Sequence, residues 1–285
     1  MIAIIMKELR NYFSQMTGYI FLALNTLLTA LFFVAMGVIN PNFHMVLNSV
    51  TFLFFVMIPT LTMRLFADEV KNRTDQLLFT SPLATWQIVA GKYIAAAALF
   101  VGAMAVTMLF PLILSRFGPL PVSQIVGAYI GYILLGLGFI AMGLFISVMT
   151  ENQIIAAVGT AGAIFLSFLL DSIARGMPAD ATNSLIFVGV AVLCIAGILF
   201  HSTKNIIASI ILALIGFAGA GGLFINDRMM FDGLIQRVFR WLSVFSRYDT
   251  LTRGILNLSD IVFFITFALV FIYLTVNIIE KRRWS

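Results

Sequence analysis

The feature that most constrains this chain is a series of apolar stretches almost free of charge and separated by short polar gaps. Each stretch has roughly twenty residues, the length of helix that crosses the ~30 Å hydrocarbon core of a bilayer. The 285 residues include only 17 basic and 12 acidic side chains, too few to cover the surface of a soluble domain. We therefore expect an all-α polytopic membrane protein.

Eight transmembrane helices are predicted within a single transmembrane domain, residues 1–285. Their approximate bounds are residues 18–39, 47–63, 93–114, 123–149, 153–170, 183–200, 205–225 and 261–279. The two stretches between 183 and 225 are expected to form an extra helical hairpin, and six spans remain if that hairpin does not insert fully. Glycines in the fourth span permit close helix contact; these are Gly127, Gly131, Gly136, Gly138 and Gly143.

The positions of the positive residues predict the orientation, because cytoplasmic loops are enriched in Lys and Arg. With eight spans and a cytoplasmic N-terminus, every lysine lies on the cytoplasmic side. We expect a multi-pass protein of the cell (plasma) membrane with both termini cytoplasmic. The net charge is +5, but the basic residues are not clustered on one face that water could reach. We therefore expect no nucleic-acid partner. The expected surroundings of the chain are the lipid bilayer.

Two segments outside the spans have amphipathic patterns. Residues 1–16 are predicted to form an interfacial helix, or alternatively a positive flank that only sets orientation. Its apolar residues recur at steps of three and four; they are Ile2, Ile5, Met6, Leu9 and Phe13. Residues 226–258 combine arginines with aromatic side chains and predict an extracellular interfacial segment, or alternatively an aromatic belt that anchors the last span.

The loop at residues 64–92 holds seven charged residues, with apolar residues between them. Pro82 ends its first helical segment, and a second segment begins at Thr85. The pattern predicts a short cytoplasmic helix-turn-helix with one apolar face. Such an element docks into a groove of a soluble partner. The alternative is an amphipathic loop that lies on the lipid headgroups.

Motifs of several enzyme classes are missing from the sequence. The phosphate-binding Gly-x4-Gly-Lys-Ser/Thr loop is absent, since Gly91-Lys92 is followed by Tyr93. We therefore expect no ATPase site. No His-Glu-x-x-His motif occurs, and the single cysteine, Cys194, lies in an apolar stretch. A metal site and a resident cofactor are not expected.

Polar residues are rare inside the spans. Asp171 and Asp260 lie at span ends, where we expect solvated carboxylates, so the intramembrane charges of an ion-driven transporter are missing. The other notable polar groups are expected to hydrogen-bond to neighbouring helices. These groups are Asn25, Thr26, Thr29 and Thr107.

Several motifs carry a resemblance to a known family. Residues 61–92 contain, in order, Glu69, Arg73-Thr74-Asp75-Gln76-Leu77-Leu78, Ser81-Pro82 and Gly91-Lys92. This order resembles the coupling-helix region of ABC type-2 exporter permeases. Three further pieces are similar to the gliding-motility-type branch of that family. They are residues 7–13, 151–156 and 280–284.

The resemblance implies a transmembrane permease subunit of an ATP-driven ABC exporter. It implies a separate ABC ATPase subunit that binds the ATP, and pairing with a second permease copy or a sibling permease. The ATPase-coupling residues implied are Asp68, Glu69, Arg73, Thr74, Asp75, Leu77, Leu78, Pro82, Gly91 and Lys92. The hairpin at 183–225 departs from the usual six spans, and residues 226–258 resemble the extracellular, partly re-entrant helices near the exit.

Two other functional classes remain open. A membrane scaffold or assembly protein recruits a soluble partner through the same loop and moves no substrate. An ion-driven transporter is disfavoured by the missing intramembrane charge. The apolar spans favour a lipid-like or amphipathic cargo over a hydrophilic one.

Overall fold

The structure is a computed structural model that describes residues 1–37, 43–73, 83–116 and 119–284. Within these ranges the chain is helical and contains no strand. The α-helices are α1 (Ile2–Ser14), α2 (Thr17–Phe32), α3 (Phe43–Val50), α4 (Phe54–Thr62), α5 (Ala67–Lys71), α7 (Thr85–Thr107), α8 (Leu109–Leu114), α9 (Val122–Met149), α10 (Gln153–Gly176), α11 (Ala181–Thr203), α12 (Ile206–Asn226), α13 (Leu234–Leu242), α14 (Val244–Thr252) and α15 (Leu258–Trp284). The chain divides into two compact units, residues 1–167 with 247–285 (unit 1) and residues 168–246 (unit 2).

Eight helical segments in the described ranges are long and apolar enough to cross a membrane. The prediction of an all-α polytopic membrane protein with eight spans is confirmed. Two predicted boundaries are wrong: the third span was expected to begin after Lys92, but its helix begins at Thr85, and the second span was expected to end at residue 63, but its helical segment continues to Lys71. The charge of Lys92 does not end the helix, because partners inside the chain neutralise it, as described below.

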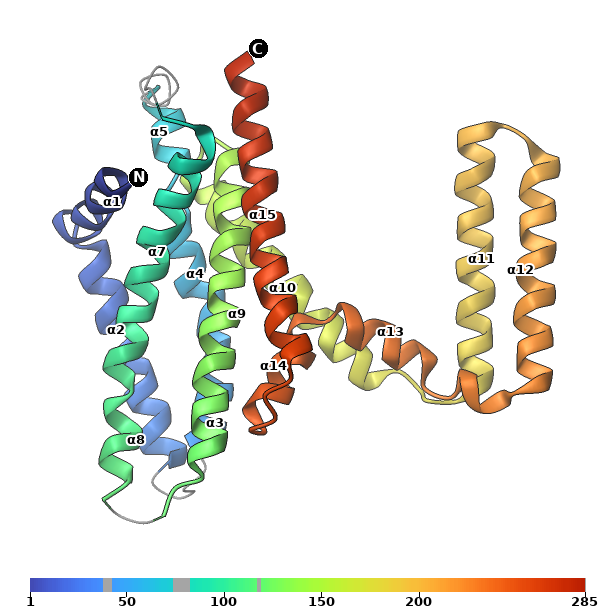
Figure 1. Ribbon diagram of the computed structural model, residues 1–285, viewed down its shortest axis with the longest axis horizontal. Helices are drawn as coiled ribbons and strands as arrows, with labels where there is room; N and C mark the ends of the chain where they lie inside the picture. The colour runs from blue at the N-terminus through green and yellow to red at the C-terminus, as the bar shows by residue number, and fades with distance from the viewer. Residues whose placement is uncertain (38–42, 74–82, 117–118, 285) are drawn as a thin grey trace. The chain divides into compact units, whose positions relative to one another are not determined.

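Unit 1 is a helical bundle built around α9, which packs against α3, α4, α7 and α15 (Figure 1). The glycines of α9 allow this close packing. A Cβ atom at Gly136 would lie 2.3 Å from the ring of Phe100 on α7, so only glycine fits there without a shift. A Cβ atom added at any of the other four glycines named above would lie 3.1 Å or less from an atom of another helix, which confirms the predicted close contacts.

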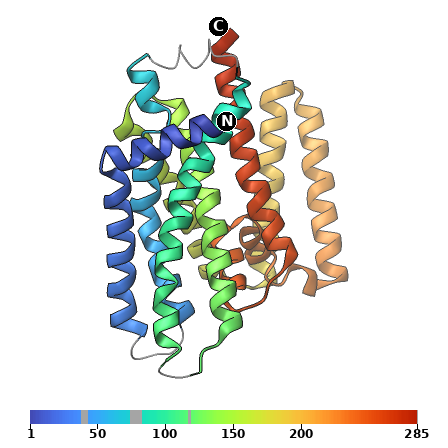
Figure 2. The ribbon, with the colours of Figure 1, turned by 60° about the vertical axis from the view of Figure 1, so that its left-hand side comes forward.

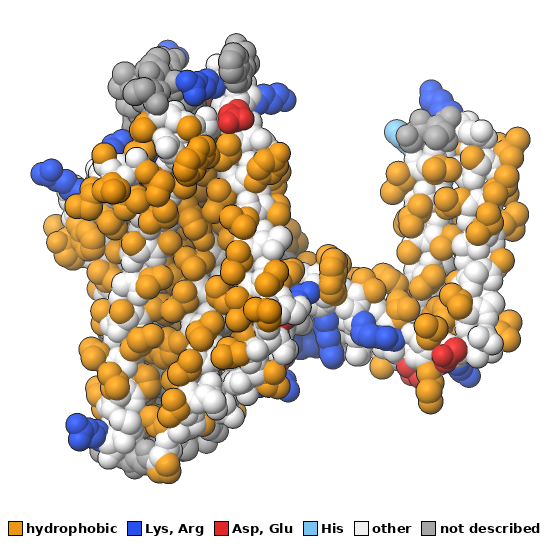
Figure 3. Space-filling view, in the orientation of Figure 1, with side chains coloured by type: hydrophobic (Ala, Val, Ile, Leu, Met, Phe, Trp, Pro, Cys, Tyr) orange, Lys and Arg blue, Asp and Glu red, His pale blue; other side chains and the backbone are white. Residues whose placement is uncertain are grey.

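Both ends of the chain lie toward the same end of unit 1 (Figure 2). On the face drawn in Figure 3, hydrophobic side chains cover the long sides of unit 1, and Lys and Arg side chains lie mainly near its two ends. This distribution suits a bundle whose sides contact lipid. The cytoplasmic location of the chain ends stays a prediction.

The part of α14 from Arg247 onward belongs to unit 1 and is packed within it. Tyr248 and Leu251 of α14 are enclosed, and both lie against Gly131 of α9. By contrast, Trp241 of α13 in unit 2 is exposed. The predicted interfacial segment at 226–258 therefore includes a part that is packed among helices.

Unit 2 contains the hairpin of α11 and α12, which pack side by side (Figure 1). Lys204 adopts a left-handed conformation, with φ of 51°, and reverses the chain. The side chain of Asn205 then accepts hydrogen bonds from the N–H groups of Ile207 and Ala208, which caps α12. The two helices thus form a helical hairpin.

The expectation of solvated carboxylates at Asp171 and Asp260 is wrong, since both side chains are buried. In unit 2, Asp171 accepts hydrogen bonds from Ser243 (3.1 Å) and Ser246 (2.6 Å), and it pairs with Arg175. In unit 1, Asp260 lies 3.2 Å from Arg247. Each buried carboxylate has at least one partner that offsets the cost of removing its charge from water.

Candidate functional site

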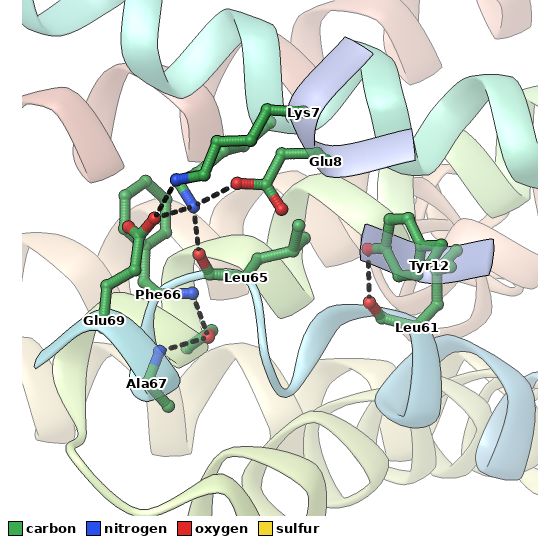
Figure 4. A network of polar contacts seen from close by, with 10 residues as sticks. Lys7, Glu8, Tyr12, Leu61, Leu65, Phe66, Ala67 and Glu69 are labelled. Atoms are coloured by element: carbon green, nitrogen blue, oxygen red, sulfur yellow. Dashed lines mark hydrogen bonds and ion pairs between the residues drawn. The ribbon is translucent and has the colours of Figure 1, made fainter. Parts of the chain in front are cut away.

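Lys92 is a charged residue in the interior of unit 1, with 1% of its surface exposed. Its Nζ lies 3.0 Å from Glu8 Oε1 of α1 and 2.9 Å from Glu69 Oε1 of α5, and it donates to the carbonyl of Leu65 at 2.6 Å. Figure 4 shows Glu8 and Glu69 converging from these different elements. A buried ammonium costs several kcal/mol unless it is paired, and these three acceptors match its three N–H donors.

The charged side chains around Lys92 balance each other. Lys7 lies 3.5 Å from Glu69, so two ammonium groups face two carboxylates. The ring of Phe66 lies under Lys92, 4.9 Å from its Nζ. We call Lys7, Glu8, Glu69 and Lys92 the Lys92 cluster. It joins α1, α5 and α7, which are far apart in the sequence.

Further contacts fix α1 on the end of α4 and on the segment that follows it. Tyr12 donates a hydrogen bond of 2.8 Å to the carbonyl of Leu61, and Arg64 donates one of 3.1 Å to Gln15. Burial, and secondly the charge of Glu8, raises the pKa of Tyr12, so its hydroxyl keeps its proton and remains a donor.

The packing of α1 on α7 is equally close. A Cβ atom at Gly91 would lie 3.0 Å from the side chain of Ile4, so a larger residue at this position would push α1 away from α7. Gly91 is one of the residues that the sequence resemblance assigned to coupling. Its place in the structure is the surface on which α1 lies.

The start of α5 is held by α9. The hydroxyl of Ser147 accepts hydrogen bonds from the N–H groups of Phe66 (3.2 Å) and Ala67 (3.3 Å) and donates one of 3.2 Å to the carbonyl of Met63. The first N–H groups of a helix have no partner within the helix. A buried side chain from another span therefore replaces the solvent that would otherwise satisfy them.

Asp68 connects α5 to a further helix, because its carboxylate accepts a hydrogen bond from Gln153 at the start of α10. A cavity of about 420 Å³ lies beside the Lys92 cluster. Its lining combines apolar surface with polar side chains of both signs of charge; the polar side chains include Lys7, Asn11, Gln15, Arg64, Asp68 and Asn72. Among the described residues, no group of three or more His, Cys, Asp or Glu side chains is arranged to hold a metal ion.

The ten residues that the sequence assigned to coupling fall into three groups. Asp68, Glu69, Gly91 and Lys92 are brought together with α1 and α10. Arg73 is exposed just after α5 and has a left-handed φ of 55°. The remaining five lie outside the described residues; they are Thr74, Asp75, Leu77, Leu78 and Pro82.

Sequence reasoning missed Glu8, Tyr12 and Ser147 as parts of this site. The buried side of α1 is Ile4, Glu8 and Tyr12, which recur every four residues. The apolar pattern chosen from the sequence instead includes Ile2 and Met6, which are 77% and 63% exposed. If polar residues had been counted together with apolar ones, the four-residue spacing of Ile4, Glu8 and Tyr12 would have predicted the buried side of α1.

The fold and the site together define a multi-pass helical membrane protein in which the short helix α5 is tied to four other helices. The chain belongs to the ABC-2 family of transporter proteins. The family model described as "ABC-2 family transporter protein" matches residues 8–218, well over half of the chain. The protein is thus an ABC-2 type permease, the membrane component of an ABC transporter.

The matched range includes the Lys92 cluster except for Lys7, and all of α11 with part of α12. Most of the hairpin that the sequence analysis treated as a departure from the family therefore lies within the match. No curated protein and no solved structure matches the chain. The gliding-motility-type branch stays a prediction.

Proposed function

We propose that the chain is the permease subunit of an ATP-driven exporter, and that a separate ATPase subunit docks on the cytoplasmic segment at residues 64–92. The observation that carries this proposal is the attachment of α5. Contacts with α1, α7, α9 and α10 hold this helix of five residues. A force on α5 is therefore transmitted to four helices at once.

In this proposal, the buried charges of the segment hold it together, and its exposed charges contact the ATPase. Glu69 and Lys92 face each other inside unit 1, so they hold the segment together and do not present their charges to a partner. Arg73 is exposed at the end of α5, where a partner's surface can reach it. Arg73 and the neighbouring Thr74 and Asp75 are the docking contacts that we propose, with Leu77 and Leu78 as apolar anchors.

Movement of α5 has a path into the bilayer. The Lys92 cluster ties α5 to α1, and α1 leads into α2 through Met16, whose φ of 62° makes a sharp turn. Gly18 at the start of α2 lies against the backbone of Tyr12, and a Cβ atom there would be 3.1 Å from its oxygen. ATP-driven displacement of α5 thus reorients α2. A second copy or a sibling permease completes the pathway, and an amphipathic cargo suits its apolar walls.

Reversing the charges of the docking contacts tests the ATPase partner. Arg73→Glu combined with Asp75→Lys is expected to lower recovery of the co-expressed ATPase with the affinity-purified permease roughly tenfold, because reversed charges repel the partner's complementary groups. Membrane insertion should be unchanged. Arg116→Glu, an exposed change on the predicted opposite side, is the control. Equal recovery of the ATPase with both variants contradicts the docking role.

The orientation is tested by a cysteine at position 74. Thr74→Cys in a Cys194→Ser background, which removes the chain's own thiol, is expected to react with an impermeant maleimide only in inside-out vesicles. Every lysine lies on the same predicted side, which is the physical basis of this expectation. Arg116→Cys in the same background should show the reverse. Labelling of the Thr74→Cys variant in intact cells would place residues 64–92 outside.

A further inference from the structure

The side of α2 that faces the bundle is half polar. Its buried residues are Gly18, Phe21, Asn25 and Thr29, which recur at steps of three and four and so form one stripe. The other faces of α2 carry large exposed apolar residues such as Tyr19, Leu24 and Leu27. The polar residues of this stripe thus lie where lipid and a second permease copy cannot reach them.

Asn25 and Thr29 have no hydrogen-bond partner, although they are 0% and 1% exposed. This holds for both polar atoms of the Asn25 amide and for the hydroxyl of Thr29. Other buried threonines of the spans behave differently. Thr62 and Thr160 each donate to the carbonyl four residues earlier, at 2.9 and 2.8 Å.

The sequence analysis expected these groups to hydrogen-bond to neighbouring helices. The hydroxyl of Thr107 on α7 meets the expectation in part: it accepts from Tyr129 of α9 at 3.5 Å, but it donates to Met104 of its own helix at 2.8 Å. For Asn25 and Thr29 it is wrong. A buried polar group without a partner destabilises the state in which it is found. These two residues therefore favour a state in which a partner reaches them.

We infer that Asn25 and Thr29 form a binding site for an uncharged hydrogen-bonding group, a hydroxyl or an amide, on an amphipathic cargo. The site is closed in this structure and opens when α2 separates from its neighbours. An amide and a hydroxyl both donate and accept, which matches a group that does the same. The sequence of α2 contains no acidic or basic residue, so a charged headgroup would find no counter-charge on this helix. This assignment rests on the proposed transport function, since it names the class of molecule transported.

The connection between α1 and α2 explains how the site is controlled. The turn at Met16 and the contact of Gly18 with Tyr12 fix the direction of α2 relative to α1. Because the Lys92 cluster fixes α1 on α5, displacement of α5 changes the surroundings of Asn25. Cargo binding and ATPase docking are in this way linked through one continuous stretch of chain.

The test uses the full chain in lipid nanodiscs without any ATPase. Three photoreactive benzophenone probes share one alkyl chain and differ in the end group: a monoacylglycerol, a free carboxylate and a plain hydrocarbon. Irreversible crosslinking accumulates product from a minor open state, so the site need not be open most of the time. Mass spectrometry of the crosslinked peptides then counts capture on α2.

The expected result is several-fold more capture of the monoacylglycerol than of the other two probes. Asn25→Leu combined with Thr29→Val should lower that capture at least about fivefold, because both hydrogen-bonding side chains are lost. Thr266→Val is the matched control, since Thr266 is exposed on α15 and donates to its own helix at the carbonyl of Val262. Capture by this control should match the parent chain.

Thermal unfolding of the same samples separates binding from structure. The double variant should unfold at the same temperature as the parent or higher, because it removes polar groups that lack partners. Equal capture of all three probes, unchanged capture by the double variant, or a lowered unfolding temperature would each overturn the inference. Because no ATPase is present, failure of ATPase docking on residues 64–92 leaves this result unaffected.

Discussion

Lys92→Met is expected to lower the apparent unfolding temperature of the purified chain by roughly 6 to 20 °C. The change removes the ammonium but leaves the carboxylates of Glu8 and Glu69 in place without it. Breaking a buried ion pair by removing one partner costs about 3–5 kcal/mol, and each kcal/mol lowers the unfolding temperature of a chain of this size by about 2–4 °C. Thermal denaturation followed by the loss of soluble protein in detergent measures the effect.

Two further variants show whether removal of the ammonium beside these carboxylates causes this loss. Lys281→Met removes an exposed lysine and should change the unfolding temperature by no more than about 2 °C. Lys92→Met with Glu8→Gln and Glu69→Gln removes all three charges together, and it should recover at least half of the loss. A triple variant no more stable than Lys92→Met would contradict the role assigned to the Lys92 cluster.

Ser147→Ala is expected to release the start of α5 from α9. It leaves the N–H groups of Phe66 and Ala67 and the carbonyl of Met63 without their buried partner. Each such group costs about 1–3 kcal/mol, and partial rearrangement reduces the total to about 2–4 kcal/mol. Hydrogen exchange at residues 66 and 67 should become at least about tenfold faster, since opening of α5 no longer breaks these bonds.

The control for this variant is Ser167→Ala. The hydroxyl of Ser167 donates to the carbonyl of Ala163 within its own helix, so its removal leaves no donor unsatisfied. Exchange at residues 66 and 67 should then equal that of the parent chain. If Ser147→Ala also leaves exchange unchanged, α5 is held by Asp68 and Glu69 without help from α9.

The number and order of the spans could be predicted from the sequence, because each span is a local run of apolar residues. The hairpin of α11 and α12 was predicted for the same reason. The start of the third span was not. A rule based on charge ends a span at Lys92, whereas the partners that neutralise this lysine come from α1 and α5.

The candidate site could be predicted only in part. Family resemblance identified Glu69, Gly91 and Lys92, but it gave no sign that Glu69 and Lys92 pair with each other. Ser147 and Glu8 were missed because their partners lie 80 or more residues away along the chain. The lack of hydrogen-bond partners at Asn25 and Thr29 on α2 could not be predicted from the sequence. Polar residues in a span more often hydrogen-bond to neighbouring helices.

The separation of Glu8 from Lys92 also sets the order in which this protein is assembled during synthesis. The two residues are 84 positions apart, so α1 leaves the ribosome long before α7 exists. Until α7 is made, Glu8 lacks Lys92 as its partner, whereas the contacts of Tyr12 with Leu61 and of Gln15 with Arg64 need only residues made earlier. The attachment of α1 is therefore completed in two stages, first on α4 and the residues that follow it and then on α7.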